Sequence, residues 1–410
     1  MSRVLRGKRI AVGVSGGIAA FKAAELVSKL VKEGSEVRVA MTPNATRFVS
    51  PLTFATLSRN PVITSTFTDV SAWRVDHVEL ARWADAMVIA PATANVIGKV
   101  ASGIGDDFLT TCVMAMRCPV LVVPAMNSAM WDSPAVRRNV RVLRADGFHV
   151  MEPEEGMLAC QDWGKGRMPS PERIIARLRW LLAPKDLAGV RTLVTAGPTR
   201  EHIDPVRYIS NPSSGKMGYA IAAAAVERGA IVTLVAGPTQ LEPPEGVNLV
   251  QVVSAKEMYH RVLERFPEQD VVIKAAAVSD YRPAHAEPEK IKKSAQELLL
   301  RLERTEDILE ELGSKKGDRI LVGFAAETTD LVEHAMEKVR RKNLDLIVVN
   351  DVSPASSGKT GFESDTNAVK LIDSQLNVTD VPLQPKADLA HVILDKVVEL
   401  LERRKAVRAQ

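Results

Sequence analysis

The first half of the chain alternates short, almost wholly apolar runs with longer stretches of helical periodicity. The apolar runs "EVRVAMT", "AMVIAPA" and "PVLVVPAM" occupy residues 36–42, 86–92 and 119–126. Strands that are apolar on both faces and are separated by helices are typical of a parallel sheet covered on both sides. We therefore expect an α/β domain here, with a helix from about Pro171 near its end.

The second half repeats this pattern. Its apolar runs are "AIVTLVAGPT", "DVVIKAAAV", "RILVGFAAET" and "LDLIVVN", at residues 230–239, 270–278, 319–328 and 344–350. They predict a second parallel sheet. The segment "NAVKLIDSQLNVTDV" (367–381) has the alternation of a β-hairpin, and a C-terminal helix is expected from about Lys386.

Both halves begin alike, with "GKRIAVGVSGG" (7–17) and "GVRTLVTAGPT" (189–199). Each consists of a basic residue, an apolar strand and a turn of small residues. Nucleotide-binding α/β domains begin in this way and hold the ligand at the carboxyl end of the first strand. Because a connector containing Pro and Gly, "APKDLAG", separates the halves, we predict two Rossmann-like domains in series, at residues 1–187 and 188–410.

Composition agrees with two domains and excludes one class of partner. The chain has 410 residues, 46% of them hydrophobic and 25% charged, with a net charge of +4. That length exceeds one ordinary core. Aromatic residues make up only 4% and are not interleaved with basic clusters such as "KIKK" (290–293), so no nucleic-acid platform is expected. Phosphorylated small molecules remain candidate partners.

Cysteine usage and the N-terminus indicate a cytoplasmic protein. The three cysteines, Cys112, Cys118 and Cys160, are odd in number and form no CxxC pair, which favours a reducing compartment. The first residues resemble a signal peptide faintly, but three glycines interrupt the apolar stretch and "KAAELVSKLVKEG" follows with helical periodicity. A strand, a turn and a helix fit better, and no run is long enough to span a membrane.

Two common nucleotide motifs can be tested and fail. The loop "ISNPSSGKMG" (209–218) looks like a P-loop, but Ser210 and Met217 stand where that motif needs Gly and Ser or Thr. The turn "GVSGGI" has Ser15 and Ile18 at two of the three glycine positions of GxGxxG, and none of the four tyrosines begins a Tyr-x-x-x-Lys motif. A dehydrogenase therefore has little support. The 209–218 loop can still be an anion site or an ordinary capped helix start.

Several features of the first half become informative when they are taken together. They are "DHVELARWAD" with His77, "PATAN" from Pro91 to Asn95, "PAMNSAMW" with Asn127, and a glycine-rich segment around Cys160. Singly, His77 is an ordinary helix-start histidine and Cys160 an inert thiol. As an ordered set they resemble the flavin-dependent cysteine decarboxylases, among them the phosphopantothenoylcysteine decarboxylases, whose pattern is a histidine, PASAN, PxMNxxMW and a flap cysteine. Thr93 replaces the serine of PASAN but keeps its hydroxyl.

The resemblance implies an FMN-binding, flavodoxin-like domain that decarboxylates an N-acyl cysteine. Loss of CO₂ needs an electron sink, which a flavin provides by oxidising the thiol carbon. By resemblance His77 assists oxidation and decarboxylation, Asn127 and Met130 hold the substrate, and Cys160 returns a proton from a mobile flap. The implied FMN- or acyl-substrate-binding residues are Gly13, Ser15, Gly16, Gly17, Thr42, Pro91, Thr93 and Asn95.

The second half resembles phosphopantothenate–cysteine ligases. The segment "AGPTREHIDPVRYISNPSSGKMG" (196–218) is followed in family order by "KAAAVSDYRP", "EKIKK", "GFAAET" and "EKVRRKNLDLIVVND". Bacterial enzymes of coenzyme A biosynthesis often join these two activities in this order, and the resemblance covers nearly the whole chain. It implies activation of a carboxylate by CTP as an acyl-cytidylate, with Mg²⁺ on the triphosphate.

Roles in the second half follow from the same resemblance. Lys290 serves the first half-reaction, although without its flanking motifs "KIKK" is equally well a solvated loop. Arg207 and Asn211 face phosphopantothenate and the acyl-nucleotide, and Asn211 donates to the oxyanion formed as cysteine attacks. The implied nucleotide-binding residues are Ala275, Asp280, Lys290, Glu306, Asp307, Ile308, Phe324, Lys338 and Lys342. Metal ligands are not indicated.

An alternative is a regulatory flavin-binding protein without turnover, because flavin-domain relatives with such roles exist. The combination of His77, Asn127 and Cys160 with a complete ligase half argues against it. The resemblance also implies a homo-oligomer with trimeric flavin domains and paired ligase domains. A dodecamer satisfies both, and the FMN site then lies at a subunit interface.

Overall fold

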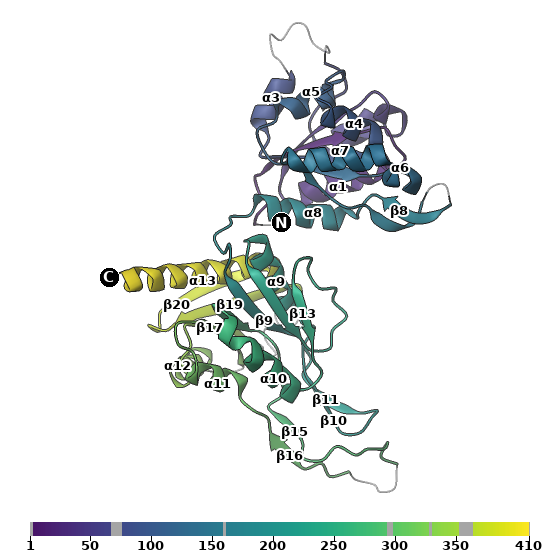
Figure 1. The fold of residues 1–410 in the computed structure, drawn as a ribbon. Helices are drawn as coiled ribbons and strands as arrows, with labels where there is room; N and C mark the ends of the chain where they lie inside the picture. The colour runs from purple at the N-terminus through teal and green to yellow at the C-terminus, as the bar shows by residue number, and fades with distance from the viewer. Residues whose placement is uncertain are drawn as a thin grey trace. The chain divides into compact units, whose positions relative to one another are not determined.

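The computed structural model describes residues 3–66, 76–158, 161–292, 298–327, 330–351 and 364–409. The chain divides into two compact units, Met1–Ala183 and Pro184–Gln410 (Figure 1). Each unit is an α/β domain built on its own mainly parallel sheet, so the predicted fold class is confirmed. No helix in the described ranges is long and apolar enough to cross a membrane.

The sheet of the first unit has the strand order β3-β2-β1-β4-β5-β6, and all its pairings are parallel. With the two-residue edge strand β3 this is the Rossmann order, and without β3 it is the flavodoxin order. The strands are β1 (Arg9–Val14), β2 (Glu36–Met41), β3 (Val62–Ile63), β4 (Ala86–Ala92), β5 (Val120–Pro124) and β6 (His149–Val150).

Helices cover both faces of this sheet, as the unbroken apolar strands predict. One face packs against α1 (Ala20–Lys32), α2 (Pro51–Ser58) and α8 (Pro171–Leu182). The other packs against α3 (Asp76–Trp83), α4 (Ala94–Ala101), α5 (Phe108–Ala115) and α7 (Pro134–Ala145). The short elements are η1 (Ala45–Arg47), α6 (Ser128–Asp132) and the hairpin β7 (Glu154–Met157)/β8 (Trp163–Arg167).

Local sequence explains where the helix α8 begins. The Ser170 hydroxyl accepts a hydrogen bond from the Arg173 N–H, which is one of the amides that a helix start leaves without a partner. Pro171 occupies the first helical position, where no amide hydrogen is needed. Ile174, Ile175 and Leu178 then recur at helical spacing and are buried against the sheet.

The sheet of the second unit has the order β13-β12-β9-β14-β17-β18-β19-β20. Its first six strands are parallel and, numbered along the chain, follow the Rossmann order 3-2-1-4-5-6. They are β13 (Asn248–Gln251), β12 (Ile231–Ala236), β9 (Arg191–Ala196), β14 (Val271–Lys274), β17 (Ile320–Glu327) and β18 (Leu346–Asp351).

An antiparallel hairpin extends this sheet, as the 367–381 pattern predicted. Its strands are β19 (Thr366–Asp373) and β20 (Val378–Pro385), and α13 (Lys386–Ala409) follows at once. The helices α9 (Lys216–Glu227) and α13 cover one face, and α10 (Ala255–Arg265), α11 (Ile308–Ser314) and α12 (Leu331–Arg341) cover the other. The turn η2 (Phe266–Glu268) follows α10.

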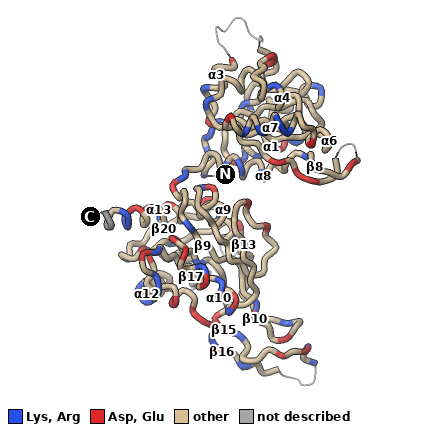
Figure 2. Tube along the Cα trace, viewed as in Figure 1, with Lys and Arg blue, Asp and Glu red and all other residues tan. Residues whose placement is uncertain are grey.

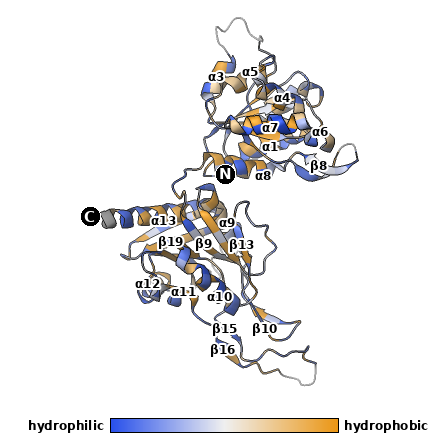
Figure 3. Cartoon of the chain, viewed as in Figure 1, coloured by the Kyte–Doolittle hydropathy of each residue, from blue (hydrophilic) through white to orange (hydrophobic). Residues whose placement is uncertain are grey.

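Two small antiparallel ribbons leave the body of the second unit side by side (Figure 1). They are β10 (Arg200–His202)/β11 (Tyr208–Ser210) and β15 (Tyr281–Pro283)/β16 (Leu302–Arg304). In both units the sheet interiors are apolar and the helices are two-sided (Figure 3), while charges of both signs are interspersed along the chain (Figure 2). The ribbons carry several residues that the sequence had marked as functional.

Candidate functional site

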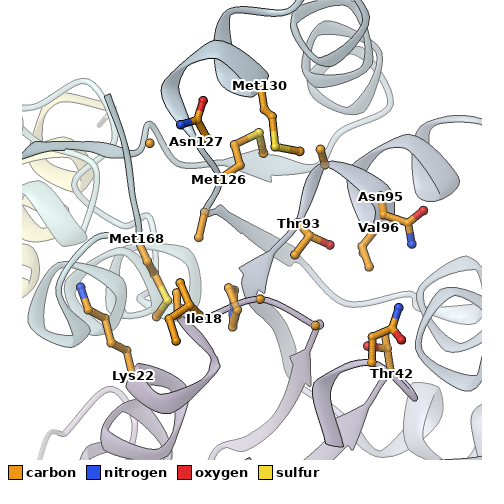
Figure 4. Close-up of a pocket in the computed structure, with 18 of the residues that line it drawn as sticks. Ile18, Lys22, Thr42, Thr93, Asn95, Val96, Met126, Asn127, Met130 and Met168 are labelled. Carbon is orange, nitrogen blue, oxygen red and sulfur yellow. The ribbon is translucent and has the colours of Figure 1, made fainter. Parts of the chain in front are cut away.

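The first unit has a cavity of about 990 Å³ at the carboxyl ends of β1 and β4. This is the point where strand order reverses, and open α/β sheets bind ligands there. The walls come from the Gly16–Gly17 turn, the Thr42–Asn44 segment, the Pro91–Val96 segment, the Ala125–Met130 segment and the β7/β8 hairpin. Figure 4 shows Thr93 and Asn95 on one side of the cavity, Lys22 on a second side, and Asn127 and Met130 on a third side.

The glycine turn lies against its neighbours with no room for a side chain. A Cβ added to Gly16 would lie 2.4 Å from Asn44 Cβ and 2.8 Å from its backbone carbon. At Gly17 it would lie 3.2 Å from the Thr93 methyl group. These glycines therefore let the β1–α1 turn approach the opposite wall closely, which leaves backbone rather than side chains facing the cavity.

Ser15 lies behind this wall and does not line the cavity. Its side chain is fully buried, and its hydroxyl donates to Pro91 O at 2.7 Å and accepts from the Thr93 N–H at 3.0 Å. It therefore joins β1 to the start of the Thr93–Asn95 segment. Gly13 also lies behind the wall, under Leu109 of α5. Direct ligand contact by Ser15 or Gly13 stays a prediction.

The PAMNSAMW segment forms a second wall. Asn127 caps α6 by accepting the Ala129 N–H at 2.8 Å, and this contact orients its amide at the cavity edge. Met126 and Met130 line the cavity beside it, whereas Trp131 is fully buried. Strand β8 packs on this wall, since the Met126 N–H donates to Gly166 O at 3.0 Å.

Three basic side chains that the sequence did not mark as functional also line this cavity. Lys99 forms ion pairs with Asp106 at 2.7 Å and Asp107 at 3.4 Å. Lys22 and Arg167 also line the cavity. Burial lowers the pKa of Lys22, and the positive charge of Arg167 lowers it further. Only the position of Lys22 two residues into the helix after the glycine turn could have suggested it from sequence.

Two of the expected catalytic residues are not placed in the cavity. His77, in the first turn of α3, is partly buried and is not among the lining residues; its backbone carbonyl accepts from the Cys112 thiol at 3.5 Å. Cys160 lies outside the described residues. The roles of both stay predictions.

In the second unit the segments that follow β9 and β14, on either side of the corresponding strand-order reversal, lie against each other. The backbone is tightly interlocked there. The Gly197, Gly215 and Gly237 segments touch, and a Cβ on Gly218 would lie 2.5 Å from Ala196 Cβ. Gly215 has a positive φ of 80° at the start of α9. The glycines of the 209–218 loop thus serve close helix–strand packing, and Lys216 pairs with Asp365 at 2.6 Å.

Three of the nucleotide-site candidates already take part in ion pairs. Lys342 forms an ion pair with Asp307 at 2.6 Å, and Arg282 with Glu306 at 3.0 Å. Burial opposes ionisation of Asp307, but the hydrogen bonds from Lys342 and the Glu310 N–H, together with the positive charges of Lys342 and Lys274, lower the pKa of that carboxyl group. Asp307 also caps α11 by accepting from two backbone amides.

The other nucleotide-site candidates differ in how far their side chains are exposed. Ile308 is buried, so only its backbone can face a ligand. Ala275, directly after β14, and Phe324, within β17, are partly buried. Asp280 is exposed and Lys338 partly buried. Lys274, which sequence analysis missed, ends β14 nearby; burial lowers its pKa to about 8, against the attraction of Asp307.

Asn211 and Arg207 belong to the β10/β11 ribbon and its flank. The amide nitrogen of Asn211 lies 3.2 Å from Ala277 O and 3.1 Å from Val278 O. It therefore faces two carbonyls, and the predicted oxyanion contact, which needs it to leave them, stays a prediction. Arg207 bonds to Asp204 and to Ile291 O, so its expected contact with substrate is likewise untested. Lys290 is exposed next to Ile291.

Comparison with known proteins agrees with the two-unit architecture. The family model described as Flavoprotein matches residues 1–182, and that described as DNA/pantothenate metabolism flavoprotein C-terminal domain matches residues 187–401. The coenzyme A biosynthesis bifunctional protein CoaBC of Bacillus subtilis is 47% identical over 97% of this chain and 98% of its own length. The protein of the same name from Escherichia coli K12 is 45% identical over 96% and 97%.

Solved structures are also similar to each unit. One is the C-terminal domain of a coenzyme A biosynthesis bifunctional protein CoaBC, 45% identical over 53% of this chain and 99% of that chain, with a TM-score of 0.46. Another is the FMN-dependent cysteine decarboxylase SpaF, 35% identical over 42% and 94%, with a TM-score of 0.38. On its full-length identity to the curated relatives, the chain belongs to the family of bifunctional coenzyme A biosynthesis proteins, CoaBC.

Proposed function

We propose that the chain carries out two consecutive reactions. The second unit ligates 4′-phosphopantothenate to cysteine with CTP, and the first unit decarboxylates the resulting 4′-phosphopantothenoylcysteine to 4′-phosphopantetheine. The observation that carries this is the cavity at the strand-order reversal of the first unit, which Gly16, Thr93 and Asn127 line. In the second unit the amide of Asn211 lies against the segment that follows β14. Family membership supports both activities.

The cavity of the first unit fits FMN. Its volume lies within the usual range for cofactor sites, about 300–1,000 Å³. The Gly16–Gly17 turn presents backbone that any larger residue would cover. Gly16, Gly17, Thr42, Thr93 and Asn95 would hold the cofactor. When bound, FMN supplies reversible two-electron chemistry, which allows the thiol carbon of the substrate to be oxidised before CO₂ leaves.

The PAMNSAMW wall would hold the acyl-cysteine. Because its oxygen caps α6, the amide of Asn127 is fixed at the cavity edge, where it would bind the substrate's carboxylate or amide. Met130, 47% exposed, would pack against the pantothenoyl part. Cys160 would return a proton to the product, since a thiol of ordinary pKa, about 8.5, is mostly protonated at neutral pH.

His77 supports a proposal about assembly. It does not line the cavity of its own chain, so we assign it to the cavity of a neighbouring copy, where it would act as base or carboxylate partner. This requires a homo-oligomer in which first units meet around their FMN sites. Trimeric first units and paired second units would together form a dodecamer.

In the second unit the chemistry is activation of a carboxylate. A carboxylate oxygen of phosphopantothenate attacks the α-phosphorus of CTP and pyrophosphate leaves; the cysteine amine then attacks the acyl carbon and CMP leaves. Lys290 would stabilise charge in the first step and Asn211 the oxyanion in the second. Ala275, Asp280, Glu306, Asp307, Ile308, Phe324, Lys338 and Lys342 would surround the nucleotide.

Mg²⁺ would arrive with the triphosphate. Among the described residues no group of three His, Cys, Asp or Glu side chains could hold a metal ion. A preformed cage is not required, because protein-bound Mg²⁺ keeps several waters and commonly uses one or two carboxylates with substrate phosphates.

The test is incubation of the purified chain with 4′-phosphopantothenate, cysteine, CTP and Mg²⁺. Phosphopantetheine, CO₂, CMP and pyrophosphate should form in equal amounts. Replacing CTP with ATP should abolish the products. Formation of none of them from CTP by FMN-reconstituted protein would refute the proposal, and a regulatory flavin-binding protein would then be the better description.

A further inference from the structure

A buried carboxylate that no motif assignment used, Asp204, lies in the turn between β10 and β11. Asp204 has a fully buried side chain and receives five hydrogen bonds or ion-pair contacts from three residues. Burial opposes its ionisation, but the bonds from Val206, Arg207 and Ile291 hold the pKa of this carboxyl group far below its usual value. Asp204 therefore stays ionised throughout the working pH range.

The two oxygens of Asp204 have different partners. Oδ1 accepts the backbone N–H groups of Val206 and Arg207, both at 2.8 Å, and so closes the turn of the ribbon. Oδ2 accepts Nε of Arg207 at 2.9 Å, contacts its Nη2 at 2.6 Å, and accepts the Ile291 N–H at 3.2 Å. One oxygen thus shapes the turn, and the other joins it to a segment 87 residues further along the chain.

The segment that Oδ2 holds is the one that carries Lys290. Arg207 Nη2 also donates to Ile291 O at 2.8 Å, so both backbone polar groups of Ile291 are bound by the Asp204–Arg207 pair. A third bond joins the Glu287 N–H to Ile203 O at 2.9 Å. Residues 284–292 form neither helix nor strand, so these ribbon contacts take the place of a regular hydrogen-bond ladder there.

The side chain of Lys290 is not held directly by any of the described residues. Its side chain is exposed and has no hydrogen-bond partner within the described ranges. A long, mobile ammonium on irregular backbone loses much of its value for charge stabilisation, because catalytic contacts depend on placement to about 1 Å. Fixing the neighbouring peptide group reduces that freedom.

We propose that Asp204 is a positioning residue for the ligase reaction: through Arg207 and both backbone groups of Ile291 it holds Lys290 in place for formation of the acyl-nucleotide. The proposal rests on the proposed function, in which Lys290 serves that step. It also gives Arg207 a structural task that is separate from any contact with substrate.

Asp204→Asn separates the two tasks of the carboxylate. The amide oxygen can replace Oδ1 and keep the turn. The NH₂ group then takes the place of Oδ2, where it faces the donors of Arg207 and Ile291 and can accept from neither. The tether to the Lys290 segment is lost while the ribbon turn is retained.

The experiment measures pyrophosphate release from CTP and 4′-phosphopantothenate in the absence of cysteine, using the full chain. Asp204→Asn should slow this step about 10- to 100-fold, with the dissociation constant for CTP changed less than about threefold. In a Lys290→Ala background the same substitution should change the rate less than about threefold, because a residue acting only through Lys290 has nothing left to position. Asp373→Asn is the matched control; Asp373 also accepts two backbone amides in a tight turn, between β19 and β20, and its replacement should leave the rate unchanged.

Arg207→Met gives an independent reading should Asp204→Asn fold poorly. It removes the donor to Ile291 O and should show the same dependence on Lys290. Equal losses with and without Lys290, or no loss in its presence, would overturn the inference. If the unmodified chain released no pyrophosphate, the proposed ligase function itself would fail, and the two failures are distinguishable.

Discussion

Replacing Gly166 with alanine tests the packing between the β8 strand and the PAMNSAMW wall. A Cβ at Gly166 would lie 2.2 Å from Met126 O and 3.3 Å from the Met126 carbonyl carbon. Both atoms are backbone, so no side-chain rotation relieves the clash. Restoring ordinary van der Waals distance requires β8 to move back by roughly 1 Å, which also stretches the bond from the Met126 N–H to Gly166 O, now 3.0 Å.

The magnitude follows from these two effects. Forcing a methyl group into a packed contact costs about 1–3 kcal/mol, and a weakened backbone hydrogen bond adds about 1 kcal/mol. We expect the free energy of unfolding of the first unit to fall by about 2–4 kcal/mol. Decarboxylation should slow about 100-fold, because the wall carrying Asn127 and the strand β8 move apart by about 1 Å.

The assay is release of CO₂ from 4′-phosphopantothenoylcysteine, with thermal unfolding measured in parallel. Gly156→Ala is the matched control on the same hairpin, since its Cβ would meet only the flexible end of Arg167, at 3.4 Å. The ligase activity of the same polypeptide should be unchanged. Normal stability and decarboxylation within twofold of the parent in Gly166→Ala would refute the described packing.

Three further predictions concern the second unit. Arg228 is buried between Asp186 and Asp395 and forms ion pairs with them at 2.5 and 2.8 Å. Arg228→Met should therefore lower the free energy of unfolding by about 3–5 kcal/mol in urea titrations. An unchanged urea midpoint would contradict this. Folding lowers the pKa of Lys274 from 10.5 to about 8, so the folded state binds fewer protons than the unfolded state between these pH values. The free energy of unfolding, measured relative to Lys274→Met, should therefore rise by up to about 3 kcal/mol from pH 8 to pH 10.5. A difference between the two proteins that does not change with pH would contradict this. Asn211→Asp should slow coupling to cysteine about 10²- to 10³-fold while acyl-cytidylate accumulates, as mass spectrometry would detect; rapid normal turnover would reject the role.

Sequence was sufficient for most strands of the two sheets, because each of those strands is an apolar run flanked by turn residues. The short strands β3, β6 and β13 were not predicted. Sequence was also sufficient for β19/β20, where polar and apolar residues alternate. The ribbons β10/β11 and β15/β16 went unpredicted, because strands of three residues such as Tyr208–Ser210 have too little length for a periodic signal. Long-range pairing, rather than local propensity, forms them.

The sequence identified some residues of the candidate site correctly and gave no sign of how others are used. Gly16, Thr93, Asn127 and Met130 carry motif signals, and all four line the cavity. Ser15 carries the same kind of signal, yet its hydroxyl is used to join β1 to Thr93. A motif identifies which residues matter to a fold, but only the packing shows whether each faces the ligand or supports a residue that does.

Residues acting through tertiary contacts could not have been found from sequence. Asp204 stands 87 positions from Ile291, and no spacing rule joins them. Arg167 looks like a solvated charge, yet it lines the cavity of the first unit. The burial of Lys274 becomes visible only when Asp307 and Lys342 pack around it.

The most direct test of the account is the absorption spectrum of the purified chain after incubation with FMN and removal of unbound cofactor. The account predicts the bands of oxidised flavin at about one equivalent per chain, and their loss in a Gly16→Val variant whose ligase activity is intact. A colourless protein that takes up no flavin at any FMN concentration would contradict it.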